Sequence, residues 1–455
     1  MLELTNILKA LAPGLETNVQ LLGEIIKGIY RISSGGVTMK NISRWTDKGG
    51  SYRSIQRFYS HSIDWLKLNI LLFNFAYLPE KTGFRYVLAL DETVEDKAGK
   101  RTFGINWFYS SIVGKVIRSI SSHVISIVDT EKGKSFALTH HQTVKTELRP
   151  KRKKAKKKHA LQGKGKSKRK AGRPKGSKNK SNTKKAGLLY TSFELLLTLV
   201  LPILQATGFT IRYVLGDGAY GNKTCCLIVR ELGLELISKL NRNTTLFLPY
   251  QGEYSGKGRR KKYGDKVDYQ NIGEQYLVST KMVDQVKTKI YQIKGVWTKR
   301  MPFLLNVIII VKIDIETQKR GRAVLFSTDL SLEAFTILRF YSLRFQIEFN
   351  FRDAKQYFGL SDFKNIKEQQ VKNAIGLSLF MTNLSMVLIE QAQQNWKEEN
   401  LSIQDLKAYF RAEKYVEDIL NTLEIPSESI LIHQTFQDVL KIGAINRTKS
   451  KALVS

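Results

Sequence analysis

The order of strand and helix signals along the chain predicts an α/β fold with helical regions at both ends. Three segments rich in β-branched and aromatic residues come in series, and an apolar helix, a fourth strand, a second helix and a fifth strand follow them. In chain order these segments are RYVLALDET (85–93), RTFGINWFYSSI (101–112), SSHVISIVD (121–129), AGLLYTSFELLLTLVLPILQATG (186–208), TIRYVLGDGAYG (210–221), NKTCCLIVRELG (222–233) and LELISKL (234–240). A succession of this kind is typical of one sheet covered by helices.

Length and composition agree with a folded chain of several domains. The sequence has 455 residues, of which 42% are hydrophobic and 25% are charged, as in globular proteins. This length allows two to four domains, each with a sizeable core. Cys225 and Cys226 are adjacent, so they offer neither a disulfide framework nor a four-ligand zinc site, and the six histidines form no metal-ligand spacing.

The net charge indicates a polyanionic partner. A formal charge of +34 and an isoelectric point near 9.9 point to nucleic acid or to an anionic membrane surface. The longest apolar run, Leu195–Leu204, covers about half a bilayer and contains Pro202, and the N-terminal residues lack the features of a signal peptide. We therefore expect a cytoplasmic, nucleoid-associated protein that binds double-stranded DNA and no membrane.

Residues 1–80 are predicted to form a helical DNA-binding domain. The segment TMKNISRWTDKGGSYRSIQRFYSH (38–61) gives a short helix, a Gly49–Gly50 turn and a second helix with Ser51 at its N-cap. In the second helix Ile55, Phe58 and Tyr59 can pack against a core. Its outward-facing side chains, which we expect to read DNA, are Arg53, Gln56 and Arg57. Two packed core helices without DNA contacts are the alternative.

The segment from Arg149 to Lys185 carries 19 Lys and Arg and no acidic residue. It has too few apolar residues to fold alone, so a disordered basic loop is predicted. Within it the stretch AGRPKGSKNK is similar to an AT-hook, whose Gly-Arg-Pro core lies in the narrow minor groove of A/T-rich DNA, and Arg173 is the arginine of that core. The alternative is a tether that binds phosphates and releases counterions without reading the groove.

A change of pattern at about residue 249 predicts a β-rich insertion over 249–330. A basic, Gly-rich link precedes four strand-like segments: EQYLVSTKMV, TKIYQIKGVW, FLLNVIIIVKIDI and GRAVLFSTDL. Trp297 stands beside basic residues in KGVWTKR, where it could contact DNA or simply pack in a core. After residue 367 the chain is predicted to be helical, with a C-terminal helical domain at 381–455.

The segment from Phe340 to Leu360, FYSLRFQIEFNFRDAKQYFGL, is predicted to be one amphipathic helix. At about 100° per residue, its polar residues Tyr341, Arg344, Glu348 and Lys355 share an arc of roughly 60°. Glu348 lies within an apolar run, where an unpaired carboxylate is costly. For the helix alone, a solvated face with an Arg344–Glu348 pair is the simpler interpretation.

Two further carboxylates change that interpretation. Asp91 is predicted to end the first strand, and Asp217 to end the fourth, between Gly216 and Gly218, which would leave room for a ligand. The strand order is also that of the ribonuclease-H-like fold, in which the first and fourth strands are neighbours. The helix could then bring Glu348 to the same rim, where three convergent carboxylates repel one another unless cations neutralise them. Oxygen ligands without His or Cys suit two Mg²⁺ or Mn²⁺ ions and phosphodiester chemistry.

Taken together, the three acids resemble the catalytic triad of the DDE transposases. The spacing Tyr341-x2-Arg344-x3-Glu348-x6-Lys355 is similar to the Y-R-E-K signature of bacterial insertion-sequence transposases of the family-four (IS-four) branch. GDGAYGNK, LFSTDL and FGLSDFK also resemble that family, and the similarity covers roughly residues 85–380.

The resemblance implies a ribonuclease-H-like core with Asp91, Asp217 and Glu348 as metal ligands. The core would comprise 81–248, interrupted by the basic loop, and 331–380 with the Glu348 helix. Tyr341, Arg344 and Lys355 would contact DNA phosphates near the cleaved end. In relatives the β-rich insertion contacts the transposon end and can hold a Trp beside a flipped base, and this role would fall to Trp297.

The expected function is therefore that of a Mg-dependent, cut-and-paste DNA transposase of a mobile element. It would cleave the terminal inverted repeats, in some relatives through a hairpin intermediate, and join the 3′-hydroxyls to target DNA. A homodimer on DNA is expected, because two ends must be brought together. Two alternatives stay open at this point: a metal-dependent endonuclease of the same fold that does not join ends, and a non-catalytic DNA-binding protein descended from a transposase.

Overall fold

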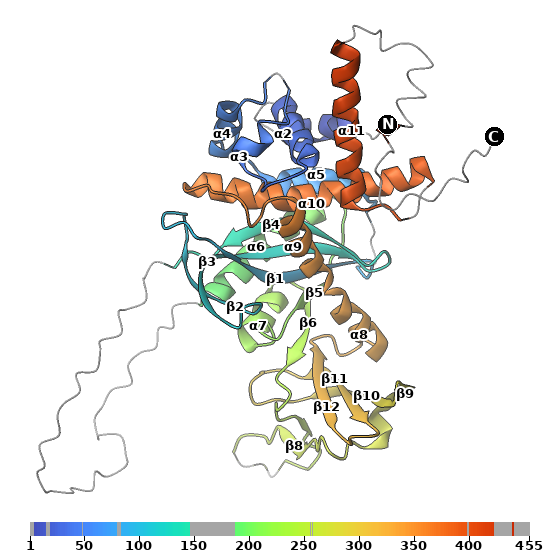
Figure 1. Ribbon diagram of the computed structural model, residues 1–455. Helices are drawn as coiled ribbons and strands as arrows, with labels where there is room; N and C mark the ends of the chain where they lie inside the picture. The colour runs from blue at the N-terminus through green and yellow to red at the C-terminus, as the bar shows by residue number, and fades with distance from the viewer. Residues whose placement is uncertain are drawn as a thin grey trace, which may run out of the picture.

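A ten-stranded mixed sheet forms the centre of the protein, with helices from both ends of the chain packed over it (Figure 1). The computed structural model describes residues 4–14, 19–47, 49–79, 83–145, 187–254, 256, 258–397, 400–422 and 439–440. The strands of the sheet are β1 (Tyr86–Asp96), β2 (Asn106–Ser110), β3 (Lys115–Asp129), β4 (Lys134–Gln142), β5 (Tyr213–Gly216), β6 (Glu235–Leu240), β9 (Leu277–Val283), β10 (Val286–Val296), β11 (Leu305–Asp314) and β12 (Arg320–Ser327). The predicted α/β class is confirmed.

Strand order explains how distant segments meet. The order is β2-β3-β1-β5-β6-β12-β11-β10-β9, and β4 also pairs with β3. Only β1–β5 and β5–β6 are parallel; the other pairs in the sheet are antiparallel. The first and fourth predicted strands, β1 and β5, are therefore neighbours, as expected.

Three details differ from the sequence prediction. Strand β4 was not predicted, because its polar end around His140 and His141 obscures the apolar residues at its start. Strand β1 continues to Asp96. The strands of residues 249–330 also extend the central sheet, since β12 pairs with β6 in the register Ser327↔Ile237. A two-stranded sheet of β7 (Phe247–Pro249) and β8 (Tyr263–Lys266) lies beside them.

Strand β1 is buried on both faces, so its apolar residues are nearly continuous. Leu88 and Leu90 pack into the larger core with the helices of both chain ends, while Val87 and Ala89 pack into a smaller core against helix α8 (Ala334–Leu343).

Helices at the two chain ends pack together on one side of the sheet (Figure 1). The N-terminal helices are α1 (Leu4–Leu11), α2 (Val19–Arg31), α3 (Met39–Ile42), α4 (Tyr52–Ser60) and α5 (Trp65–Ala76), with a 3₁₀ turn η1 (Ala12–Gly14). The others are α6 (Leu188–Ala206), α7 (Lys223–Glu231), α9 (Gln346–Tyr357), α10 (Glu368–Trp396) and α11 (Ile403–Thr422), with a 3₁₀ turn η2 (Glu274–Tyr276).

Helix α10 contacts both the N-terminal helices and the sheet, which α5 also contacts directly through Asn69 and the carbonyl of Leu138. Asn373 Oδ1 accepts a hydrogen bond of 3.0 Å from Trp65 Nε1, and Tyr30 lies 2.7 Å from Ser385 through their hydroxyls. On the opposite side, Asn383 Nδ2 donates to the carbonyl of Ala137 in β4 at 2.6 Å. Two helices in the described residues, α6 and α10, are long and apolar enough to cross a membrane, but 83% of the apolar window of α10 is buried inside the protein against 39% for α6. Helix α10 is therefore a core helix.

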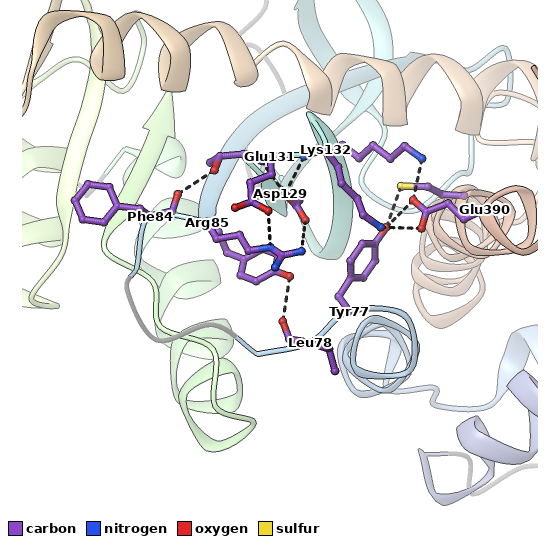
Figure 2. A network of polar contacts seen from close by, with 12 residues as sticks. Tyr77, Leu78, Phe84, Arg85, Asp129, Glu131, Lys132 and Glu390 are labelled. Atoms are coloured by element: carbon purple, nitrogen blue, oxygen red, sulfur yellow. Dashed lines mark hydrogen bonds and ion pairs between the residues drawn. The ribbon is translucent and has the colours of Figure 1, made fainter. Parts of the chain in front are cut away.

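A polar network ties the same three layers together (Figure 2). Lys132, in the turn between β3 and β4, binds Glu390 of α10 at 3.0 Å and lies 4.7 Å from the ring centre of Tyr77, which follows α5. Arg85, just before β1, lies 3.5 Å from Asp129 at the end of β3. The N-terminal helices, the sheet and α10 are thus joined by charges as well as by apolar contacts.

Candidate active site

The register of two parallel strands brings Asp91 and Asp217 together. Leu90 of β1 is paired with Gly216 of β5, and the two aspartates are the next residues along the chain. Strand β5 ends there, as predicted. Strand β1 does not, because β3 pairs with it from Tyr86 to Asp96, so Asp91 lies within the strand and the expectation that it ends the strand was wrong.

The loop after β5 holds Asp217 by local hydrogen bonds. Its Oδ1 accepts from the backbone N–H of Ala219 at 2.9 Å, and its carbonyl accepts from the hydroxyl of Ser238 at 2.6 Å. The missing side chain of Gly216 makes room for Tyr220, since a Cβ there would lie 2.7 Å from the Cβ of Tyr220. Gly216 is therefore needed for packing inside the protein.

The predicted helix over 340–360 is two helices. Helix α8 ends at Leu343 and α9 begins at Gln346, and hydrogen bonds from residue i+3 to residue i, such as Glu348 N–H to Phe345 O at 3.0 Å, tighten the turn between them. The backbone stays near helical values, with φ −51° and ψ −35° at Arg344. Arg344 and Glu348 therefore still share a face, although they lie on either side of the junction.

The guanidinium of Arg344 joins two of the three carboxylates. Its Nη1 lies 3.0 Å from Asp91 Oδ2, and its Nη2 lies 2.9 Å from Glu348 Oε1. The Arg344 side chain is 14% exposed, so both charged hydrogen bonds lie in a partly desolvated setting where they are stronger than at the surface. The predicted Arg344–Glu348 pair exists, and Asp91 extends it into a bridge between helix and sheet.

All three carboxylates line one cavity of about 810 Å³. The residues around it come from β1, the end of β2 and the turn after it, the start of α6, the loop after β5, the α8–α9 junction and α9: Asp91, Glu92, Thr93, Val94, Tyr109, Ser110, Ser111, Ile112, Leu189, Asp217, Ala219, Tyr220, Arg344, Glu348, Phe351, Arg352, Lys355 and Gln356. A cavity of this size can hold a segment of an extended polymer as well as a small molecule.

Burial and neighbouring charge both disfavour ionisation of Asp91. Burial raises its pKa to about 6, with a further contribution from Asp217 and Glu348, although the backbone N–H of Glu92 and the charge of Arg344 oppose the rise. Burial also disfavours the charge of Arg344, but Asp91 and Glu348 raise its pKa overall. Arg344 therefore partly neutralises the negative charge that Asp91 and Glu348 bring to the cavity.

The donor chemistry of these side chains suits a hard divalent cation, because their ligands are carboxylate oxygens. In the arrangement described, Arg344 stands between Asp91 and Glu348. Across the described ranges, no group of three or more His, Cys, Asp or Glu side chains is arranged to hold a metal ion. A cation shared by all three acids would need Arg344 to move aside.

The other two residues of the signature have partners of their own. Lys355 Nζ lies 2.8 Å from Glu95 Oε1, and Glu95 is nearly buried and also accepts from Ser361 at 2.8 Å. Tyr341 packs against the smaller core, and burial raises the pKa of its hydroxyl. Lys355 lines the cavity, whereas Tyr341 lies beside it, with its ring centre 6.0 Å from the Arg344 guanidinium.

Trp297 lies at a second, strongly basic cavity of about 430 Å³. Its backbone pairs with Phe247 through two hydrogen bonds of 2.8 Å, Tyr263 meets its ring edge-on, and Lys262 lies 5.1 Å from the ring centre. The lining residues are Lys223, Arg259, Arg260, Lys261, Lys262, Tyr263, Trp297, Lys299, Arg300, Met301 and Pro302. Trp297 is half-buried, so it is anchored in the fold while its surroundings suit phosphates.

The predicted recognition helix is present as α4. Ser51 caps it, accepting from the N–H of Ser54 at 3.2 Å. Ile55, Phe58 and Tyr59 are buried, while the three side chains proposed to read DNA are exposed: Arg53, Gln56 and Arg57. They lie on the N-terminal unit, outside the lining of the carboxylate cavity. Arg173 and the basic loop of 149–185 lie outside the described residues.

Two residues near the carboxylates were not predicted from the sequence. Tyr220 and His123 are buried beside them, with the Tyr220 hydroxyl 3.2 Å from His123 Nδ1. Burial raises the pKa of Tyr220, and Asp91 and Asp217 raise it further, so the phenol stays neutral. Tyr220 could have been found from the sequence, because it is part of the GDGAY motif that contains Asp217. No local pattern marks His123, because its position depends on the pairing of β3 with β1.

Comparison with known proteins gives the family of the chain. A comparison with curated proteins gives no match. The family described as DDE superfamily endonuclease matches residues 31–296, which is more than half of the chain. This range contains Asp91 and Asp217 and ends before Glu348. The chain belongs to the DDE superfamily of endonucleases.

Proposed function

We propose that the protein is a DNA transposase that cleaves the ends of a mobile element and joins the freed 3′-hydroxyls to target DNA. Membership of the endonuclease superfamily supports a nuclease or transposase role. The observation that carries the proposal is the presence of Asp91, Asp217 and Glu348 in one cavity, with Arg344 between two of them. Strand order and these acids together favour a ribonuclease-H-like core of the family-four branch.

Asp91, Asp217 and Glu348 are the residues that would hold Mg²⁺ or Mn²⁺, two ions in each active site. When bound, such ions activate the attacking hydroxyl and stabilise the leaving oxygen at a phosphodiester. The chain's own part is to bring the DNA backbone against these carboxylates. Arg344, Lys355 and Arg352 are the cations that line the cavity, and each has a carboxylate partner that a phosphate could replace.

The DNA duplex is proposed to contact three further regions. The exposed face of α4 would read the terminal inverted repeats through Arg53, Gln56 and Arg57. The basic cavity around Trp297 would hold the backbone near the cleaved end, and a base flipped out during hairpin formation could stack on the Trp297 ring. Arg173 would enter the minor groove from the basic loop. A homodimer would assemble on paired ends.

The proposal is tested with DNA flanking the coding sequence. Short inverted repeats found there give duplex substrates, one intact and one pre-cleaved with a labelled 3′-end, to be incubated with a plasmid target and Mg²⁺ or Mn²⁺. We expect cleavage of the first and joining of the second. Asp217→Asn and Glu348→Gln should each lower both rates by roughly a thousandfold. Glu316→Gln changes an exposed acid in the β11–β12 turn and should have no effect.

The alternatives give different results in the same assay. Cleavage without any joined product would identify an endonuclease that does not transfer strands. Specific binding to the repeats with neither product, and with no effect of Asp217→Asn, would identify a non-catalytic DNA-binding protein. Joining that persists in Glu348→Gln would remove Glu348 from the proposed catalytic set.

A further inference from the structure

The turn between β2 and β3 exposes more apolar surface than a hairpin in water normally does. Strand β2 alternates buried and exposed residues, so Trp107 and Tyr109 point outward from the same face, 46% and 62% exposed. At the tip Ile112 is 84% exposed, and Gly114 closes the turn with φ +67° and an N–H bonded to the carbonyl of Ser110. The hairpin thus holds large apolar side chains in solvent on a rigid support.

The hairpin forms one wall of the carboxylate cavity. Tyr109, Ser110, Ser111 and Ile112 line it together with Asp91, Asp217 and the α9 residues described above. Strand β2 is anchored there, because it pairs with β3 from Asn106 to Ser110 and β3 pairs in turn with β1. Tyr109 and Ile112 therefore lie at the candidate active site and are held by the sheet that carries Asp91, while Trp107 lies two residues before Tyr109, outside the cavity lining.

Positive charge accompanies these apolar side chains. Residues directly opposite one another on paired strands share a face, so Arg118, opposite Trp107, lies on the exposed face of β2. Lys115 is opposite Ser110 at the turn and lies on the other face. Lys145, from the segment after β4, lies over the ring of Phe108 on the other face of β2, at 3.8 Å from the ring centre, and its Nζ is 2.6 Å from the carbonyl of Trp107. Aromatic rings interleaved with cations are the pattern of single-strand nucleic-acid surfaces, where bases stack and phosphates are neutralised.

We propose that the β2–β3 hairpin is a stacking platform for unpaired bases of the DNA strand next to the scissile phosphate. The inference deepens the proposed function and rests on it. Tyr109 presents a ring face to a base, Trp107 lies two residues further along the same face for a second base, and Ile112 at the tip enters the gap left by the displaced strand. Cations on the hairpin and on α9 favour a polyanion over a second copy of this basic chain.

The platform selects DNA by strand separation and not by sequence, because every base has a face on which an aromatic ring can stack. It would therefore favour ends that open easily beside the cleavage site. This specificity is separate from reading of the repeats by α4, which lies away from the cavity lining.

The test compares two fluorescent probes made from the flanking repeat, both bound by the full chain in EDTA so that no cleavage occurs. One is a fully paired 30-base-pair duplex, and the other has three unpaired bases beside the expected cleavage site, with 2-aminopurine at the first of them. We expect the wild type to prefer the unpaired probe by about tenfold and to quench its 2-aminopurine. Tyr109→Ala should remove most of that preference and the quenching, because the ring that stacks on the unpaired base is lost.

Two controls keep the result interpretable. Tyr109→Phe keeps the ring and should behave like the wild type, and Phe335→Ala removes an aromatic residue of α8 that is 52% exposed and outside the cavity lining. An equal preference in wild type and Tyr109→Ala would overturn the platform, as would loss of a dimer in Tyr109→Ala, which would make this face a protein interface. Failure of the wild type to cut or join either substrate in Mg²⁺ would instead count against the proposed function.

Discussion

The guanidinium of Arg344 lies 3.0 Å from Asp91 and 2.9 Å from Glu348, so one arginine side chain fills the space between two acids that are 257 positions apart in the sequence. A cation at that position relieves the repulsion between carboxylates in a partly buried cavity. A divalent ion on the same oxygens would do the same, so the arginine and the ion compete for them.

The first prediction follows from this competition. Arg344→Gln should bind Mn²⁺ about three- to tenfold more tightly than the wild type in the absence of DNA, because the competing charge is removed. The same variant should join DNA ends more slowly, since Arg344 is also a proposed phosphate contact. Titration calorimetry measures the first effect and the strand-transfer assay the second.

Arg352→Gln is the matched control for this prediction. Arg352 lines the same cavity but is paired with Asp353, and its side chain is 59% exposed. Its loss should leave the Mn²⁺ affinity within about twofold of the wild type. Equal Mn²⁺ affinity in the wild type and Arg344→Gln would show that the bridge does not compete with the metal.

The second prediction concerns pH. Because burial raises the pKa of Asp91 from 3.8 to about 6, the folded protein binds a proton more tightly than the unfolded chain. This proton linkage stabilises the fold fully below pH 3.8, and the stabilisation is lost as the pH rises through 6. A two-unit shift corresponds to about 3 kcal/mol. Asp91→Asn should therefore gain about that much free energy of unfolding, relative to the wild type, between pH 3.5 and pH 7.5.

Urea unfolding at several pH values measures this difference, with metal removed by chelation. Asp314→Asn serves as the control. Hydrogen bonds from the backbone N–H and the side chain of Thr317 lower the pKa of that exposed carboxyl, so its ionisation stabilises the fold as the pH rises, opposite to Asp91. If the free energies of unfolding of the wild type and Asp91→Asn differ by the same amount at every pH from 3.5 to 7.5, the raised pKa of Asp91 is contradicted.

Much of the site could be predicted from sequence because local patterns fix it. An apolar strand before Asp91, another before Asp217 and a known strand order are enough to make the two aspartates neighbours. Glu348 could be added because the 3.6-residue period places it on one arc with Arg344. The N-cap at Ser51 and the buried face of α4 were likewise local features.

The remaining features depend on tertiary contacts between distant residues. The helix junction at Arg344 contains no Gly or Pro, so no local signal marks it. The pairing of Lys355 with Glu95 depends on how α9 lies against β1, and the exposure of Tyr109 depends on β2 being short and close to the cavity. Strand β4 was missed because its polar residues have partners that the sequence does not reveal. One example is His141, which lies 2.9 Å from the hydroxyl of Ser192 in α6.

The third prediction separates a structural from a DNA-binding role of Lys355. Glu95 is nearly buried, so Lys355→Met should leave its charge uncompensated and lower the free energy of unfolding by about 3 kcal/mol. Glu95→Gln combined with Lys355→Met removes both charges and should restore most of that stability. Thermal unfolding of the wild type, both single variants and the double variant gives the coupling energy directly. Additive effects would mean that the 2.8 Å ion pair contributes nothing to the fold.

The fourth prediction concerns the exposed face of α4. Arg53 and Arg57 each bring a positive charge to the DNA, so each change to Ala should reduce the slope of log affinity against log salt concentration by about one. Gln56→Ala should leave this slope unchanged and reduce the preference for the terminal repeat over random DNA, because an amide reads base edges.

All three side chains are exposed, so the free energy of unfolding should change by less than about 0.5 kcal/mol. Binding of labelled repeat and random duplexes at roughly 50 to 300 mM salt measures both the salt slope and the preference for the repeat. Lys9→Ala, an exposed cation of α1, is the control, and a salt slope that falls equally in this variant would show that α4 is not the part of the N-terminal unit that faces DNA.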